Sequence, residues 1–238
     1  MKHRINIKGA MIPTSYKWYY DWFGMESTCP QDVQKVISQA HQGDEIEVYI
    51  NSPGGVIDVG SEIYTMLRQI TETCSVKIFI TGEACSAASI VACAAYSIMS
   101  PTALMMVHCV STSDVSGNHT VMEHTAKMLV TADNALCTAY MTKAGMSRED
   151  ALNMMEQETW LTAEQAKERG LVDEVMFEEK AGGGGELVAG PFFRLPSEER
   201  LAQIKASIEG DKGNAGNSVE AKLRSLELTG LKNKKRKE

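Results

Sequence analysis

The chain has 238 residues, of which 43% are hydrophobic and 23% charged, and its formal net charge at pH 7 is −7. That composition is typical of a folded globular protein with one large domain and room for an appendage. No apolar run approaches the roughly 20 residues that cross a bilayer, and no continuous apolar core follows residues 1–7, so we expect neither a membrane segment nor a signal peptide.

The charge is divided unevenly along the chain. Residues 1–180 carry 13 Lys and Arg against 23 Asp and Glu, a net charge of −10, whereas residues 181–238 carry 11 against 8, a net charge of +3. An acidic body argues against nucleic acid as its ligand. The six cysteines form no CxxC pair and most lie among apolar or small residues, which predicts buried thiols in a reducing cytoplasm rather than disulfides or a zinc site.

Strands and helices alternate in the first part of the chain. Ile5 and Ile7 alternate with polar residues and predict a strand over 4–12. Residues 13–30 hold six aromatic side chains without a clean period; we expect ordinary packing, although a flap, an oligomer contact or a lid would also fit. The elements expected next are helices over 30–41 and 58–70 and strands over 45–51 and 76–80, with Gly54-Gly55 directly after the first of these strands.

Small residues follow the strand predicted over 76–80. Gly82 interrupts the pattern, and Ser86 opens an alanine-rich run to Tyr96 that predicts a tightly packed helix. A serine at a helix N-terminus lies where backbone N–H groups stabilise an oxyanion. Such a serine also serves simply as an N-cap, and on this stretch alone the cap is the commoner case.

The alternation continues in the second part, which ends in two capping-box patterns that begin at Ser147 and Thr162. His108 closes an apolar strand, and Glu158 lies in the link between two helices. The elements predicted are a strand over 104–108, helices over 120–144, 148–157 and 163–169, and a strand over 172–177.

We place a domain boundary near residue 180. The alternating elements before it predict an α/β domain with parallel strand pairing over residues 1–180. A run of four glycines begins the segment 181–238, which we predict to be a flexible linker and a largely disordered tail with a basic end.

Four positions that can carry chemistry follow predicted elements, and in parallel α/β sheets ligands bind outside the carboxyl ends of the strands, so the four can converge. Ser86 would be the nucleophile, His108 its base, and Glu158 the acid that orients His108. The N–H groups of Gly55 and Ala87 would hold the oxyanion, at about 3 kcal/mol per donor. This chemistry needs neither a metal nor another cofactor.

Each assignment has a simpler alternative. His108 in an apolar strand is equally compatible with a satisfied core histidine. Glu158 is compatible with a solvated link residue, and Glu156 is a nearby rival for the acid. His119 and His124 are expected to be exposed on or near the long helix.

Four motifs of this sequence resemble those of the Clp protease proteolytic-subunit family. They are Tyr49-Ile50-Asn51-Ser52-Pro53-Gly54-Gly55, Gly82-Glu83-Ala84-Cys85-Ser86-Ala87, Met106-Val107-His108 and the segment from Glu158 to Asp173. The resemblance implies the ClpP/crotonase-like repeated β-β-α spiral, a serine endopeptidase that works through an acyl-enzyme, and a ring-forming homo-oligomer with contacts through the long helix. It matches Ser86 to the nucleophile, His108 to the base, and Gly55 and Ala87 to the oxyanion hole. The family's acid is an aspartate, and Glu158 takes its place with one more methylene.

The sequence is most similar to the phage and prophage branch of this family, the head maturation proteases. The resemblance is carried by Trp18, Asp21-Trp22-Phe23-Gly24, Ser100-Pro101-Thr102-Ala103, Met122-Glu123-His124 and Glu158-Thr159-Trp160. It implies a capsid or scaffold protein as the polypeptide substrate, cut in the host cytoplasm or the prohead. The N-terminal stretch with which the housekeeping subunit contacts its ATPase ring is not found, which leaves an ATPase partner open. The alternatives are an ATPase-dependent housekeeping peptidase, a catalytically inactive capsid-assembly scaffold, and a crotonase-like acyl-CoA enzyme.

Overall fold

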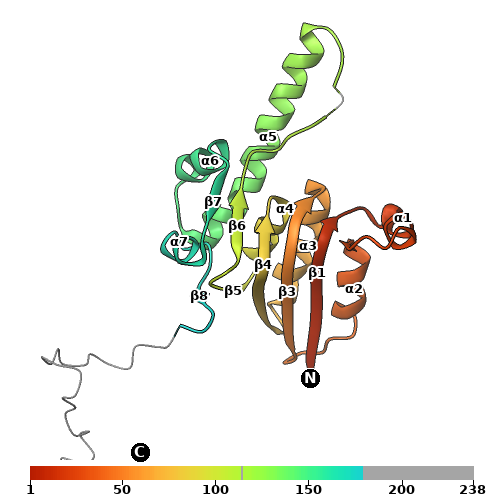
Figure 1. Ribbon diagram of the computed structural model, residues 1–238, viewed down its shortest axis with the longest axis vertical. Coiled ribbons are helices and arrows are strands. Elements are labelled where there is room, and N and C mark those ends of the chain that lie inside the picture. The colour runs from red at the N-terminus through yellow and green to blue at the C-terminus, as the bar shows by residue number, and fades with distance from the viewer. Residues whose placement is uncertain (114, 179–238) are drawn as a thin grey trace, which may run out of the picture. The chain divides into compact units, whose positions relative to one another are not determined.

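A computed structural model of the chain describes residues 1–113 and 115–178, and Figure 1 shows their arrangement. The strands are β1 (Lys2–Met11), β2 (Ser27–Thr28), β3 (Glu45–Gly55), β4 (Ser75–Cys85), β5 (Tyr96–Met99), β6 (Leu104–Val107), β7 (Thr159–Leu161) and β8 (Glu174–Val175). The helices are the short 3-10 helix η1 (Thr14–Tyr16), α1 (Lys17–Trp22), α2 (Pro30–Ile37), α3 (Ile57–Ile70), α4 (Ala87–Ala92), α5 (His119–Ala144), α6 (Arg148–Glu156) and α7 (Ala163–Glu168).

One sheet organises these elements. Its strands follow the order β2-β1-β3-β4-β5-β8 with parallel pairing. β4 pairs with β5 along its first half and with β6 along its second half, also in parallel. β7 runs antiparallel to β6. The predicted α/β domain with parallel pairing is therefore confirmed, and the antiparallel pair of β6 and β7 is an addition to it.

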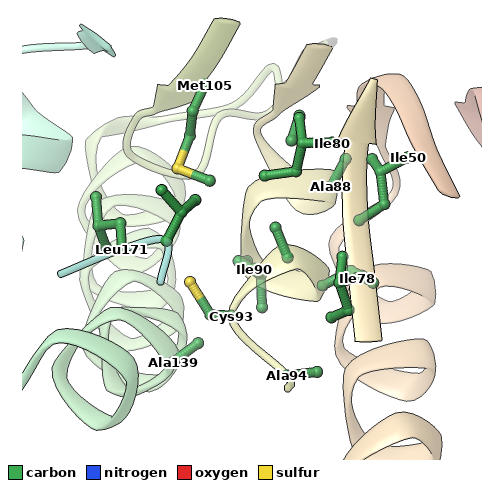
Figure 2. Close-up of a cluster of buried hydrophobic side chains, with 14 of the residues drawn as sticks. Ile50, Ile78, Ile80, Ala88, Ile90, Cys93, Ala94, Met105, Ala139 and Leu171 are labelled. Atoms are coloured by element: carbon green, nitrogen blue, oxygen red, sulfur yellow. The ribbon is translucent and has the colours of Figure 1, made fainter. Parts of the chain in front are cut away.

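The hydrophobic core covers one face of the sheet. Along β3, the alternate residues Ile46, Val48 and Ile50 are fully buried, as the period of two in the sequence predicts. Figure 2 shows Ala88 of α4 beside Ile50 and Ile80 of the sheet, and Cys93, which follows α4, beside Ala139 of α5. The small side chains of α4 let the sheet and α5 approach it closely from two sides, which is the packing that the alanine-rich run indicated.

The strands β3 and β4 are longer than predicted, and the helix α4 is shorter. β3 continues to Gly55 instead of ending at residue 51. β4 was expected to end before Gly82 but continues to Cys85, because residues 83–85 pair with β6. A Cβ at Gly82 would lie 2.2 Å from Asn51 Oδ1, which accepts a hydrogen bond from the N–H of Glu83, so a larger residue here would displace the Asn51 side chain. The helix predicted from Ser86 to Tyr96 ends at Ala92, and β5 begins at Tyr96.

The link predicted between the last two helices contains β7, and the last strand is shorter than expected. Thr159–Leu161 pair with β6, whereas β8 has two residues in place of the predicted six. Both capping predictions are confirmed. Ser147 accepts a hydrogen bond from the N–H of Asp150, and Thr162 and Gln165 make both bonds of a capping box.

The aromatic segment after β1 is exposed. It forms η1 and α1 beyond the end of β1 and returns to the sheet at β2 (Figure 1). Trp18 is 70% exposed, Trp22 81% and Phe23 61%. The expectation of ordinary core packing is therefore wrong for these three side chains, because the segment lies outside the buried face of the sheet.

Helix α5 has the predicted bounds within one residue, with Asn118 as its N-cap and Gly145 in the left-handed conformation after it. His119 and His124 are exposed, as predicted. The first buried residue of α5 is Asp133, and the half of the helix before it extends past the sheet in Figure 1. That half exposes apolar side chains, among them Met128 and Val130.

The boundary near residue 180 and the tail over 181–238 lie outside the described residues and stay predictions. Within the part of the chain that the structure describes, no helix is both long and apolar enough to cross a membrane. All six cysteines are free thiols; five are buried and Cys109 is half-buried, so the prediction of buried thiols is confirmed for those five.

Candidate active site

Ser86 occupies a strained turn between β4 and α4. Its φ of 55° and ψ of −125° lie in a region that L residues rarely adopt. The N–H of Ser86 donates to the carbonyl of Met106 at 2.9 Å, and the carbonyl of Ser86 accepts from Ser89 Oγ at 2.6 Å. The Ser86 side chain caps no backbone N–H of α4, so the interpretation as an N-cap is wrong. The turn has the form of a nucleophile elbow, in which a strained residue presents its hydroxyl at the edge of the sheet.

His108 lies directly after β6, beside Ser86. Cys85 pairs with Met106 in parallel, so the residues that follow β4 and β6 leave neighbouring strands at the same edge of the sheet. The distance from Ser86 Oγ to His108 Nε2 is 2.8 Å. When Nε2 carries no proton, Oγ donates to it, which is the arrangement in which a histidine serves as general base for a serine. The structure therefore brings these two predicted residues together.

Gly54 lets the Ser86 turn approach the end of β3. A Cβ at this position would lie 2.5 Å from the carbonyl oxygen of Cys85 and 2.7 Å from the Cβ of Ser86, and φ is +92°. The close neighbour of Gly54 is therefore the serine turn itself. A side chain here would push the nucleophile away from β3.

The two predicted oxyanion donors border the same cavity as Ser86 and His108. Gly55 is the last residue of β3, and Ala87 is the first of α4. Because the first N–H groups of a helix have no intrahelical acceptor, the N–H of Ala87 is available to an oxygen atom bound at Ser86. The position of both residues agrees with the prediction, and their role as donors stays a prediction.

Glu158 lies opposite His108 without bonding to it. Val107 pairs with Thr159 in antiparallel register, which places the residue before Thr159 across from the residue after Val107. Glu158 has a φ of 47° and is exposed, and among the described residues no hydrogen bond joins its carboxylate to His108. Its role as the acid stays a prediction. The rival Glu156 is also exposed.

The cavity at this site has a volume of about 60 Å³, and its wall is about half apolar and half polar. Besides the residues named above, its lining includes Ile57, Ile90, Val110, Leu136, Tyr140 and Met155. No Lys, Arg, Asp or Glu side chain of the described residues lines it. Because a charge that enters such a cavity loses its hydration without gaining a partner, the cavity suits a small or medium apolar side chain.

Two thiols flank the pair but are poor competitors as nucleophiles. Burial, together with the neighbouring Glu83, raises the pKa of Cys85 to about 12. Burial, together with Asp133, raises the pKa of Cys109 to about 11. Since the thiolate is the nucleophilic form of cysteine, neither thiol is expected to act as a nucleophile near pH 7.

Three polar residues around the site were not predicted from the sequence. Ser89 bonds to the Ser86 carbonyl, Tyr140 bonds to Ser89, and Asp133 bonds to the N–H of Val110. Ser89 lies within the small-residue run, and the other two lie on a helix whose sequence has no sharp apolar face. A periodicity argument could have found Tyr140 as a buried position but gives no signal that a carboxylate at 133 is buried.

Comparisons with known proteins identify several that this chain resembles. A family model described as Clp protease matches residues 31–179. The ATP-dependent Clp protease proteolytic subunit 1 of Protochlamydia amoebophila is 34% identical over 143 residues, which are 58% of this chain and 68% of the relative. The proteolytic subunit of Bdellovibrio bacteriovorus is 34% identical over 146 residues, 58% of this chain and 67% of the relative. Subunit 1 of Chlamydia abortus is 30% identical over 139 residues, 57% and 71% of the two chains.

Similarity to a solved structure bears on the fold alone. A mutant ClpP1 from Listeria monocytogenes matches with a TM-score of 0.58 and 21% sequence identity, over 73% of this chain and 91% of the other. The expected ClpP-like architecture is therefore confirmed.

Proposed function

Because the chain belongs to the Clp protease family, whose proteolytic subunits are serine peptidases, we propose that it is an endopeptidase with Ser86 as nucleophile and His108 as general base. The observation that carries this assignment is the 2.8 Å distance between Ser86 Oγ and His108 Nε2 at the edge of the sheet. The strained turn of Ser86 supports it, since strain of this kind persists where the surrounding structure enforces it and is concentrated at functional sites.

The reaction proceeds in two steps. Ser86 Oγ attacks the scissile carbonyl while His108 Nε2 takes its proton, and the oxyanion that forms is held by the N–H groups of Gly55 and Ala87. His108 returns the proton to the leaving amine as the carbon–nitrogen bond breaks, which leaves an acyl-enzyme on Ser86. A water molecule, deprotonated by His108, then releases the acid. Glu158 turns toward His108 and stabilises its protonated ring.

The substrate of this site is a polypeptide with an apolar residue before the scissile bond. The cavity beside Ser86 is bordered by Ile90, Leu136 and Met155, and no charged side chain of the described residues balances a buried charge there. A fluorogenic peptide with Leu or Met at that position is therefore the appropriate probe, and the same peptide with Asp is its matched control.

We propose two candidates for the biological substrate. The first is a capsid or scaffold protein cut during phage head maturation, supported by the sequence resemblance around Trp18 to Gly24 and by the exposed aromatic segment there. The second is a protein delivered by an ATPase ring, supported by the names of the relatives, which are ATP-dependent Clp protease proteolytic subunits. An inactive scaffold is disfavoured by the hydrogen bond between Ser86 and His108.

A homo-oligomeric ring is part of the proposal. The first half of α5 exposes apolar side chains beyond the sheet, including Met128 and Val130. A second copy of the chain would bury them, as the family resemblance implies for the long helix.

The test is the intact mass of the purified protein after incubation with a fluorophosphonate, beside the Ser86→Ala variant. A single adduct on the wild type that is absent from the variant is the expected result. A folded oligomer that takes up no adduct would refute the activated serine. Once the adduct is established, two cleavage assays separate the candidate substrates. Cleavage of scaffold protein without ATP would favour the first candidate. Cleavage of an unfolded protein that requires an added Clp ATPase and ATP would favour the second.

A further inference from the structure

Asp133 is a buried carboxylate next to the proposed active site that the reaction does not use. It is 9% exposed and is the first buried residue of α5. Its Oδ1 accepts a hydrogen bond from the N–H of Val110 at 2.6 Å, and no Lys or Arg of the described residues forms a salt bridge with it. Burying a carboxylate is costly unless strong hydrogen bonds compensate for the lost water. The bond to Val110, together with the neighbouring thiol of Cys109, therefore accounts for the position of this side chain.

The partner of Asp133 belongs to the segment that carries His108. Val110 lies two residues after His108, beyond the end of β6, where strand pairing no longer fixes the backbone. The residue between them, Cys109, donates its N–H to the carbonyl of Met155 at 3.2 Å. The segment after His108 is thus held by one bond to the α6 helix and one to α5, and the α5 bond is short and charge-assisted.

A second side chain of α5, that of Tyr140, is connected by hydrogen bonds to the backbone of Ser86. Tyr140 is 1% exposed, and its hydroxyl lies 2.8 Å from Ser89 Oγ. Ser89 Oγ must donate to the Ser86 carbonyl, which can only accept, so the single hydroxyl hydrogen of Ser89 is used there. Tyr140 is therefore the donor to Ser89. The chain of bonds runs from Tyr140 through Ser89 to the strained backbone of Ser86.

Asp133 and Tyr140 are seven residues apart, which is two helical turns, so they lie on the same face of α5 about 10 Å apart along its axis. We propose that this face positions the catalytic pair: Asp133 fixes the backbone that follows His108, and Tyr140 fixes the carbonyl of the Ser86 turn through Ser89. The inference rests on the proposed function, because it assigns positioning roles to residues that act through Ser86 and His108. Neither residue takes part in a bond-making step.

Loss of the Asp133 carboxylate should lower the rate at which Ser86 reacts. Without the acceptor on Asp133, the segment after His108 loses one of its two anchors, and His108 shifts relative to Ser86. A misplacement of about 1 Å at reacting groups costs on the order of 100-fold in rate. For Asp133→Ala we expect a rate of fluorophosphonate labelling, per folded molecule, that is roughly 10- to 100-fold below that of the wild type. For peptide cleavage we expect kcat to fall with little change in KM, because Asp133 does not line the cavity.

The matched variants separate positioning from stability. Asp133→Asn keeps an oxygen that can accept from the Val110 N–H, so it should label within about threefold of the wild type. Glu123→Ala removes the other acidic residue of α5, which is exposed, and should label like the wild type. Thermal unfolding and size-exclusion chromatography establish the folded fraction and oligomer of each variant. Tyr140→Phe removes the hydroxyl alone and should lower the labelling rate by at least threefold.

The outcomes are distinct. Equal labelling rates for Asp133→Ala and Glu123→Ala would overturn the role of Asp133, and so would Asp133→Asn behaving like Asp133→Ala, because the charge rather than the hydrogen bond would then matter. If Asp133→Ala does not fold, Asp133→Asn and Tyr140→Phe still decide: an unchanged rate for Tyr140→Phe overturns the role of Tyr140. A wild type that takes up no label refutes the proposed function instead, before any variant is compared.

Discussion

Substitution of Gly54 by alanine tests whether the end of β3 sets the position of the nucleophile. The added Cβ would lie 2.5 Å from the Cys85 carbonyl oxygen and 2.7 Å from the Ser86 Cβ, whereas ordinary contact begins at 3.4 Å. The Ser86 turn must therefore retreat by about 0.9 Å, the difference between 3.4 and 2.5 Å. A shift of that size at a reacting group costs on the order of 100-fold in rate. We expect Gly54→Ala to label with a fluorophosphonate about 100-fold more slowly than the wild type, per folded molecule.

Gly43→Ala is the matched control for this substitution. Gly43 has a φ of +88°, close to the +92° of Gly54, but a Cβ there meets nothing within 4 Å. Both variants therefore incur the strain of an L residue at positive φ, about 1–2 kcal/mol. Gly54→Ala incurs in addition the cost of overpacking, about 1–3 kcal/mol. Thermal unfolding should rank the wild type above Gly43→Ala and Gly43→Ala above Gly54→Ala, whereas only Gly54→Ala should lose labelling. Equal labelling rates for the two variants would refute the reasoning.

Three further predictions concern charge and protonation. Glu158→Gln should lower peptide cleavage by at least tenfold with the labelled residue still Ser86, since an amide cannot stabilise protonated His108 as a carboxylate does; an unchanged rate would show that Glu158 is not the acid. The α-amino group of Met1, the His41 N–H and the His3 ring hold the pKa of Asp44 well below its usual value. Because the folded-state pKa is lowered, the stabilisation is present above the unfolded-state value of about 4 and is lost as the pH falls below it. The difference in urea midpoint between the wild type and Asp44→Asn should therefore be large at pH 7 and shrink toward pH 2, and pH profiles that run parallel would contradict this. Finally, with the pKa of Cys85 at about 12 and that of Cys109 at about 11, iodoacetamide at pH 8 should leave peptide cleavage unchanged, and inactivation with adducts on either thiol would contradict the assignment of unreactive cysteines.

The sequence predicts most of the fold because its signals are local. Alternation at Ile46, Val48 and Ile50 and the caps at Ser147 and Thr162 act within a few residues, and the structure bears them out. The errors arise where a distant partner decides the outcome. β4 continues past Gly82 because β6 is there to pair with it, and residues 159–161 form a strand because β6 offers its other edge. The local sequence pattern at residues 82–85 and 159–161 does not reveal this pairing with β6.

The residues of the site likewise fall into those that the sequence predicts and those that it does not. Ser86 and His108 are predictable because each follows a recognisable strand, and the carboxyl ends of parallel strands meet at one edge of a sheet. Asp133 and Tyr140 are not, because they belong to a helix that crosses this edge by tertiary packing, and their roles depend on backbone groups of other segments. An isolated carboxylate on a mostly exposed helix has the appearance of a solvated residue in any sequence-based argument.

The strength of strand pairing also explains why Ser86 and His108, the proposed catalytic pair, are hydrogen-bonded while Glu158, the proposed acid, is not bonded to His108. Ser86 and His108 follow β4 and β6, and β4 is paired on both sides along the centre of the sheet. Glu158 precedes β7, which pairs with β6 through three residue pairs and has no other strand partner among the described residues. Short pairing of this kind fixes the backbone of Glu158 opposite His108 but leaves its exposed side chain free to rotate. Glu158, the proposed acid, is therefore the member of the site whose engagement is most sensitive to packing against β7, where Trp160 is 50% exposed.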